Sequence, residues 1–370
     1  SEKELVETFG KPDSTNFEYW FSAASFLQYS SSLRVVRAAN TSSVNAVVSG
    51  SALRIKNTDH YQNGDGSTGP YNDGSANVGE WAARTAGAWG NSLQVSVCPS
   101  ATAYEETNKT TTNDSSISIG DTTLTLTSGT DFNVGDIINF GETGGHEYRI
   151  TAVSSNDITF VRHPSGTGGL HTALAGGTQV RRRWRYYDLV DKAPGTSTYT
   201  STRSGANDEM HIVVIDEDGG ITGTAGEVLE VYDSVSKASD AKTAQGDSNY
   251  YADVIYNKSQ YIYWMDHNTG GSNWGSTASG TTFTAVDSPF VDSLVSGADG
   301  SAVTTAEMKT AYEKFADGDT LDVNLIIAGK GDATHIDNLI TIAENRKDAI
   351  VFVSPERADV VNVANSTTQT

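Results

Sequence analysis

The stretch HIVVIDEDGGITGTAGEVLEVYDSVSKASDAK, residues 211–242, decides the fold of this chain. Its first five residues form an apolar run that predicts a strand, and the acidic turn at 216–219 ends it. A Gly- and Thr-rich break follows, and residues 228–231 then predict a second strand. We therefore build the framework of the protein around these two strands and work outward from them.

The carboxy-terminal part of the sequence has an α/β pattern. Thr304 and Glu307 have the spacing of a capping box, which predicts a helix that begins there. Apolar runs at 323–328 and 350–353 flank a further helical pattern. A strand, a helix and a strand within about 30 residues predict a βαβ unit with a parallel sheet.

The sequence on either side of residue 211 alternates short strand and helix patterns with loops. Further strands are predicted at 33–38, 93–98, 250–255 and 261–265. Helices are predicted after the capping box Ser1–Glu4, over 15–29 and over 81–89. Long polar loops are predicted at 57–76 and 266–300.

Residues 110–183 have the pattern of an inserted domain. A polar linker at 107–116 precedes strand-like runs separated by Gly- and Asn-rich breaks, at 117–119, 122–126, 136–140, 148–153, 158–161 and 179–183. This rhythm is typical of a small antiparallel β-barrel or sandwich whose ends are adjacent. We therefore predict a mixed α/β, or α+β, fold: a discontinuous platform over 1–109 and 184–370 with flanking helices, interrupted by a protruding β-domain.

The composition excludes several classes of protein. The 370 residues carry 25 Lys and Arg against 46 Asp and Glu, so the net charge is −21. Such a negative field disfavours binding to the phosphates of nucleic acid. The 16 Tyr, 11 Phe and 6 Trp supply the core of a folded protein rather than a disordered acidic tail. The single cysteine, Cys98, excludes an intramolecular disulfide and a multi-cysteine zinc site.

The sequence carries neither a membrane-spanning nor a secretory pattern. Its apolar runs are far shorter than the ~20 residues of a helical span, and no basic start leads into an apolar stretch. The chain begins at a helix cap and without Met, so we treat both termini as possible truncations. We expect no membrane insertion.

Two patterns point weakly to a ligand. Gly329, Lys330 and Gly331 lie between a strand and a helix, where backbone N–H groups bind phosphates, but the third Gly of the dinucleotide motif and the Gly-Lys-Ser/Thr of a phosphate loop are missing. Asp216 and Asp218 lack the twelve-residue ligand spacing of a calcium loop. Plain turns explain both patterns better.

Clusters of reactive side chains form no specific motif. Four residues of the predicted insert could meet around zinc, although their spacing matches no ligand pattern: His146, Glu147, His163 and His171.

Arginines flank Trp184 and are expected to pair with acidic residues rather than with nucleic acid: Arg181, Arg182, Arg183 and Arg185. A triad without a nucleophile elbow can be imagined from three residues: Ser354, His335 and Asp332. Cys98 reads as a small buried hydrophobe. We expect no catalytic, cofactor-binding or metal-binding residue, no cofactor and no enzyme activity.

The stretch 211–242 closely resembles the signature of contractile tail sheath proteins of bacteriophages (myoviruses). The signature combines an apolar strand with Asp-Glu-Asp-Gly, Ile-Thr-Gly-Thr, Val-Leu-Glu and Val-Ser-Lys-Ala. Other segments are similar to that family in the same order: 9–12, 21–24, 33–37, 89–97, 194–197, 250–257 and 350–355. The family usually starts with an extended arm and a strand, and continues into a carboxy-terminal domain. The chain resembles the outer and middle portion of such a subunit.

The resemblance implies a structural subunit of the virion. Subunits of this family form six-fold rings that stack helically around the tail tube, with the baseplate and tail terminator proteins as further partners, after assembly in the host bacterial cytoplasm. Contraction of the sheath then drives the tube through the host envelope for genome ejection. The resemblance implies no binding of nucleic acid.

Other functions stay open at this point. The sheath of a non-viral contractile injection system would carry the same signature. A secreted β-rich adhesin or carbohydrate-binding protein would stack sugars on exposed aromatic side chains, and four residues are candidates: Tyr261, Tyr263, Trp264 and Trp274. A hydrolase or nucleotide-binding enzyme would depend on the weak Gly329 motif.

Overall fold

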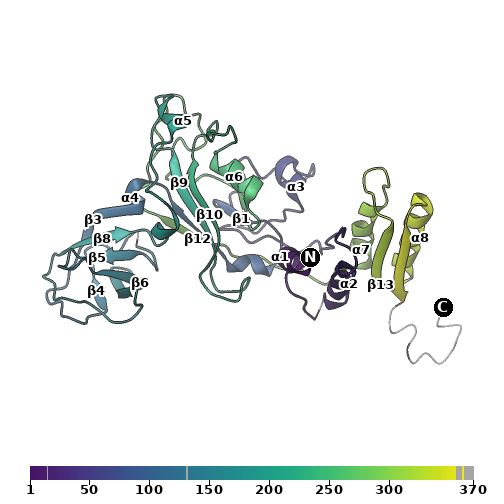
Figure 1. Cartoon of the computed structure of the whole chain (residues 1–370), viewed down its shortest axis with the longest axis horizontal. Helices are drawn as coiled ribbons and strands as arrows, with labels where there is room; N and C mark the ends of the chain where they lie inside the picture. The colour runs from purple at the N-terminus through teal and green to yellow at the C-terminus, as the bar shows by residue number, and fades with distance from the viewer. Residues whose placement is uncertain (15, 131, 356–360, 362–370) are drawn as a thin grey trace. The chain divides into compact units, whose positions relative to one another are not determined.

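The computed structural model describes residues 1–14, 16–130, 132–355 and 361. It shows a mixed α/β structure with several sheets and few helices (Figure 1). The chain forms two compact units, one made of residues 1–43 with 299–370 and the other of residues 44–298. Each unit buries hydrophobic clusters of its own.

The first unit contains a parallel strand–helix–strand arrangement. Its elements are α1 (Glu2–Phe9), α2 (Phe17–Leu27), α7 (Thr305–Tyr312), η3 (Glu313–Phe315), β13 (Leu325–Gly331), α8 (Ala333–Arg346) and β14 (Ile350–Pro355). The predicted parallel pairing is confirmed, since β13 and β14 form a two-stranded parallel sheet. The capping boxes at Ser1–Glu4 and Thr304–Glu307 are also confirmed, with reciprocal bonds at both helix starts. The predicted helix over 15–29 is α2, and residue 15 lies outside the described residues.

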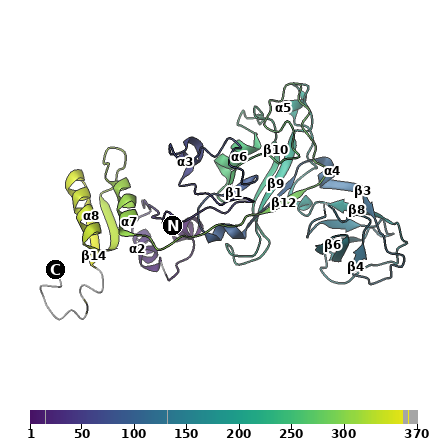
Figure 2. The ribbon, with the colours of Figure 1, turned by 180° about the vertical axis from the view of Figure 1, so that it is seen from behind.

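The second unit is built on an antiparallel sheet with the order β10-β9-β2-β12. Its strands are β2 (Leu93–Cys98), β9 (Glu209–Asp216), β10 (Glu227–Ser236) and β12 (Phe290–Ser293). Every residue of β9 is buried, because β9 has a strand on each side and packed side chains on both faces. The predicted strands at 93–98, 211–215 and 228–231 are therefore confirmed, and Figure 2 shows β9 between β10 and β12 from behind.

Short elements surround this sheet. They are α3 (Thr58–Asn63), β1 (Trp81–Ala83), η1 (Ala88–Ser92), α4 (Ala101–Tyr104), η2 (Tyr187–Leu189), α5 (Thr198–Ser201), α6 (Tyr251–Lys258) and β11 (Ile262–Trp264). β1 pairs with β11 in an antiparallel ladder. This pairing confirms the predicted strand at 261–265 and brings Trp81 opposite Trp264.

A second sheet in this unit has six antiparallel strands in the order β3-β8-β5-β6-β7-β4. Its strands are β3 (Glu105–Thr111), β4 (Thr123–Thr125), β5 (Ile137–Asn139), β6 (Glu147–Ser154), β7 (Asp157–His163) and β8 (Gln179–Arg183). A hydrophobic cluster drawn from residues 117–180 alone fills its interior, with Tyr148, Phe160 and Leu126 among the fully buried side chains. The assignment of 110–183 to an autonomous domain stays a prediction.

Two predicted elements have the wrong secondary structure. Residues 250–255 are not a strand: Tyr251–Lys258 form α6, with Tyr251, Val254 and Ile255 buried at helical spacing. Residues 81–89 are not a helix: Trp81–Ala83 form a strand because β11 supplies a pairing partner, and a 3-10 turn follows. In both cases the short apolar run fits the periodicity of a helix as well as that of a strand, so the tertiary partner decides the secondary structure.

Four further predictions differ from the structure. The polar segment 107–116 is not simply a linker, because its Thr-rich half pairs with β8 as strand β3. The loop at 266–300 contains strand β12 and buries Trp274 and Phe283. The loop at 57–76 contains α3, which Asn57 caps. Residues 33–38 run as irregular chain, without a strand partner in the described structure.

Candidate functional site

Lys237 is the centre of a buried polar network beside β9. Its ammonium group donates to the backbone carbonyls of Pro99 (2.7 Å), Asn207 (2.8 Å) and Glu209 (3.1 Å). The Nζ atom also lies 5.3 Å from the centre of the Trp274 ring. Burial lowers the pKa of Lys237 to about 8, against the opposing effect of the Asp208 charge.

Asp208 connects the segment 194–197 with the stretch 211–242 in this network. Its carboxylate accepts from the backbone N–H of Ser197 (2.8 Å), the hydroxyl of Ser197 (2.8 Å) and the hydroxyl of Ser236 (2.6 Å). Ser197 belongs to the Pro-Gly-Thr-Ser segment and Ser236 to the Val-Ser-Lys-Ala segment. Segments separated by about 40 residues are thereby joined through one buried carboxylate.

Glu209, the first residue of β9, completes the network. Its carboxylate accepts from Lys192 Nζ (2.9 Å) and from the backbone N–H of Gly195 (3.0 Å). The network thus pairs its charges and satisfies its polar groups, as buried charges require. Lys237 is fully buried and its three donors are occupied. The arrangement can hold segments together, and it offers no exposed amine to a substrate.

The carboxylates of Asp216 and Asp218, in the acidic turn after β9, also accept hydrogen bonds from the protein itself. Asp216 accepts from the backbone N–H groups of Gly219 (3.1 Å), Ile221 (3.1 Å) and Thr222 (2.6 Å), and from the Thr222 hydroxyl (2.8 Å). Asp218 accepts from the N–H of Gly220. These carboxylates shape the turn, in agreement with the structural reading of the Asp-Glu-Asp-Gly motif.

The four candidate zinc ligands are only partly brought together. The rings of His146 and His171 stack with centres 3.7 Å apart and planes 15° from parallel. Lone pairs of imidazole lie in the ring plane, so stacked rings do not converge on one ion. Glu147 pairs with Arg183, and His163 lies across from Glu147 in the ladder. The described residues contain no group of three His, Cys, Asp or Glu side chains arranged for a metal.

The glycine-rich turn after β13 is filled by protein. Gly329 has a φ of 66°, and a side-chain Cβ there would come within 2.5 Å of the Tyr19 ring. Asp332 accepts from the backbone N–H of His335 and so places a negative charge at the start of α8. That charge repels a phosphate, and Lys330 pairs with Glu18. The turn is therefore a tight βα connection.

The three residues of the imagined triad do not form one. Asp332 binds the backbone of His335, not its ring. Both ring nitrogens of His335 are buried without a hydrogen-bond partner among the described residues. Ser354 is exposed on β14, where it lies across from Lys330. No described side chain orients a base toward the Ser354 hydroxyl.

Two of the four arginines beside Trp184 pair with acidic residues of the chain, as expected, and Arg185 lies over the ring of Tyr186. Arg182 is fully buried, lies 3.5 Å from Glu106 and donates to the carbonyl of Asp287. Arg183 pairs with Glu105 and Glu147. Trp184 is buried and donates to the Ser96 hydroxyl (2.9 Å).

Most of the aromatic candidates for sugar stacking lie in the interior: Tyr263, Trp264 and Trp274 are buried. Cys98 is buried in β2, and burial raises the pKa of its thiol.

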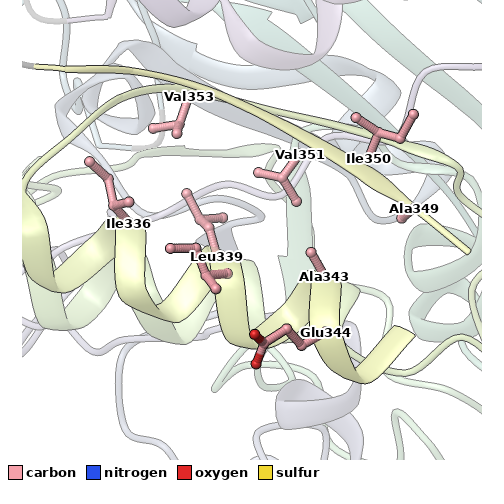
Figure 3. Close-up of a pocket in the computed structure, with 9 residues that line it drawn as sticks. Ile336, Leu339, Ala343, Glu344, Ala349, Ile350, Val351 and Val353 are labelled. Carbon is pink, nitrogen blue, oxygen red and sulfur yellow. The ribbon is translucent and has the colours of Figure 1, made fainter. Parts of the chain in front are cut away.

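The first unit has an open apolar hollow of about 390 Å³ between α8 and β14. Figure 3 shows Ile336, Leu339 and Ala343 of α8 facing Val351 and Val353 of β14. Among the described residues that line the hollow, Glu344 is the charged one. Catalysis requires several convergent polar groups, and this hollow presents one carboxylate at its margin.

Sequence reasoning missed the Lys237 network. Asp208, Glu209 and Lys237 stood in the sequence as ordinary charges next to strands. Their positions could have revealed the network, because charged residues that adjoin a fully apolar strand must be paired when that strand is buried.

Within the described residues, no helix has the length and apolar character needed to cross a bilayer.

The chain is similar to a known tail protein. No family model matches it. A curated relative, the tail sheath protein of Salmonella phage ViI, is 24% identical in an alignment that covers 96% of this chain. The chain spans about half, 53%, of that relative's length. This similarity supports a structural role in a phage tail sheath and a place in a virion.

Proposed function

We propose that this chain is part of a subunit of a contractile phage tail sheath, which polymerises helically around the tail tube. The observation that carries the proposal is the similarity to a tail sheath protein across 96% of the chain. In this role the sheath contracts when the baseplate is triggered and drives the tube through the host envelope for genome ejection. The myovirus assignment belongs to the same proposal.

The buried network around Lys237 supports a role for the second unit as a rigid part of the subunit. Subunits that rotate as near-rigid bodies need interiors that do not yield, and close-packed cores with satisfied polar groups transmit strain. Asp208 joins the segments that contain Ser197 and Ser236, and Lys237 donates to the carbonyl of the first residue of β9. We infer that the chain carries no catalytic, cofactor-binding or metal-binding residue and is not an enzyme.

The proposed partners are those of a sheath. They are neighbouring copies in stacked six-fold rings, the tail tube protein, the baseplate and the tail terminator protein. Assembly would take place in the host bacterial cytoplasm. The inserted residues 110–183 would form a β-domain that protrudes from the platform. A sheath of a non-viral contractile injection system is the second candidate, because it would share the same subunit architecture.

Electron microscopy with antibodies raised against the 370-residue chain tests the proposal. Native phage particles should bind the antibody along the whole length of a striated tail, and contracted tails should carry the label on a shorter and wider tube. Label confined to fibres, capsid or baseplate would overturn a sheath function. Label on striated tubes without capsids or genomes would favour the injection system.

A further inference from the structure

Ser234 forms a bulge in the edge strand β10. The pairing of β10 with β9 shifts register between Tyr232 and Val235, and Ser234 has a φ of 52°, in the left-handed region. The Ser234 carbonyl accepts from the Asn249 side chain (3.0 Å), and the Ser234 N–H donates to Nδ1 of His211 (3.0 Å). Two side chains therefore satisfy the backbone N–H and C=O groups of Ser234, for which the ladder gives no partner.

His211 is fully buried on β9, and its Nδ1 faces two groups with opposite requirements. Nε2 lies 2.9 Å from the carbonyl oxygen of Lys192, so the neutral ring carries its proton on Nε2. The unprotonated Nδ1 accepts from Ser234. The carboxylate Oδ1 of Asp233, however, also lies 3.0 Å from Nδ1. Only a protonated Nδ1 can donate to that carboxylate.

We propose that His211 is a pH-sensitive lock on the bulge of β10. When Nδ1 takes up a proton from water, it donates to Asp233 and can no longer accept from Ser234. The Ser234 N–H then loses its partner while the bond from Nε2 to Lys192 stays in place. The bulge then keeps the bond from Asn249 and loses the bond to His211, so its backbone becomes free to rearrange.

Burial of His211 keeps the lock closed at neutral pH, because it favours the uncharged imidazole. Burial lowers the pKa of the imidazole, whereas the hydrogen bond to the Lys192 carbonyl and the charges of Asp233 and Glu209 raise it. The ammonium of Lys192 lowers it further. The other neighbours are the rings of Trp184 and Tyr104, which are uncharged at neutral pH. Acidic conditions are therefore needed to open the lock.

Hydrogen exchange on the 370-residue chain tests the proposal. Exchange of the Ser234 amide is compared with that of Val213, a buried amide of β9, at pH 8 and at about pH 5.5; the ratio removes the intrinsic effect of pH. Loss of one hydrogen bond should lower the relative protection of Ser234 about tenfold at the acidic pH. A constant ratio, or loss of protection at both sites together, would overturn the proposal.

Two variants separate the lock from a general effect of charge. Asp233→Asn removes the carboxylate, so the change at Ser234 should move to lower pH; Asp319→Asn removes an equal charge from the first unit and should leave the change where it is. Equal behaviour of both variants would contradict the proposal. His211→Asn keeps an acceptor near the Nδ1 position without titrating, so Ser234 should become insensitive to pH. If that variant does not fold, the Asp233→Asn comparison still decides.

Discussion

At the scale of single residues, Lys237 shows how a charge can be buried without a binding function. Its ammonium group is surrounded by three carbonyl oxygens, a carboxylate and an aromatic ring within the second unit. These partners come from three parts of the sequence, at residue 99, at residues 207–209 and at residue 274, so the lysine joins distant segments. Removal of one member of such a network leaves the other polar groups buried and unpaired.

Substitution Lys237→Met should destabilise the protein by about 3 kcal/mol, because methionine fills the space but leaves three buried carbonyls without donors. The free energy of unfolding, measured from urea denaturation, checks this. Lys242→Met is the matched control, since Lys242 is exposed, and it should change stability by no more than about 0.5 kcal/mol. Equal effects of the two substitutions would show that the network contributes little.

The same residue gives a pH dependence of defined sign. The pKa of Lys237 is about 8 in the folded protein, below its ordinary value of 10.5, so the unfolded chain binds more protons between these pH values. Stability should therefore rise with pH in that window. Urea unfolding between pH 8 and about pH 9.5, below the ordinary range of tyrosine, should show this rise in the native chain and not in Lys237→Met. A parallel course for both proteins would refute it.

At the scale of elements, β3 shows that a polar segment can complete a sheet. Glu105–Thr111 contain no large apolar side chain, yet they pair with β8 from Glu105↔Arg183 to Thr111↔Gln179. Threonine favours strands, and the ladder supplies backbone bonds that composition does not reveal. A domain boundary drawn at residue 110 therefore cuts through a strand.

Two fragments test the proposed β-domain. Both 105–183 and 110–183 should give a β-type circular dichroism spectrum if the hydrophobic cluster over residues 117–180 suffices for folding. The longer fragment should have the higher melting temperature, because it keeps the whole of β3. An unfolded or helical spectrum of both fragments would show that this sheet depends on the rest of the second unit.

The contacts of this sheet with a distant segment give the reason for such dependence. Lys109 Nζ lies 3.2 Å from the hydroxyl of Ser288, Arg182 donates to the carbonyl of Asp287, and Asn133 donates to the carbonyl of Pro289. Residues 287–289 lead directly into β12 of the central sheet. These bonds connect the six-stranded sheet to the four-stranded sheet of the second unit.

At the scale of the whole molecule, charge and exposed apolar surface act in opposite directions. The net charge is −21, which makes equivalent copies repel each other. Large apolar side chains are exposed mainly in the first unit, among them Phe17, Phe21, Ile340, Ile350 and Phe352. Apolar side chains that form a contiguous exposed patch are typical of surfaces that bind other proteins.

Self-association should therefore increase with salt, because the Debye length falls from about 10 Å at 0.1 M to about 3 Å at 1 M. Sedimentation velocity of the 370-residue chain at both concentrations checks this. Phe352→Ser, which removes an apolar side chain that is 58% exposed, should weaken the association at high salt. Association that decreases with salt would show that ion pairs, rather than apolar contacts, hold the copies together.

The sequence by itself determined the elements whose pattern is local and long. The apolar strand after residue 210, the capped helix at Thr304 and the parallel βαβ unit follow from hydrophobic periodicity and capping, which need no distant partner. The overall mixed α/β class and the series of strands in the insert follow from the same patterns. The sequence also carried the signature that links the chain to sheath proteins.

Only the tertiary structure decided the short elements and the polar interior. Trp81–Ala83 became a strand because Ile262–Trp264 lie beside it, and Tyr251–Lys258 became a helix because one face packs inside the second unit. The bonds of Lys237 to Pro99, Asn207 and Glu209 join residues up to 138 positions apart. Such contacts form only after the chain has folded, so no local pattern announces them.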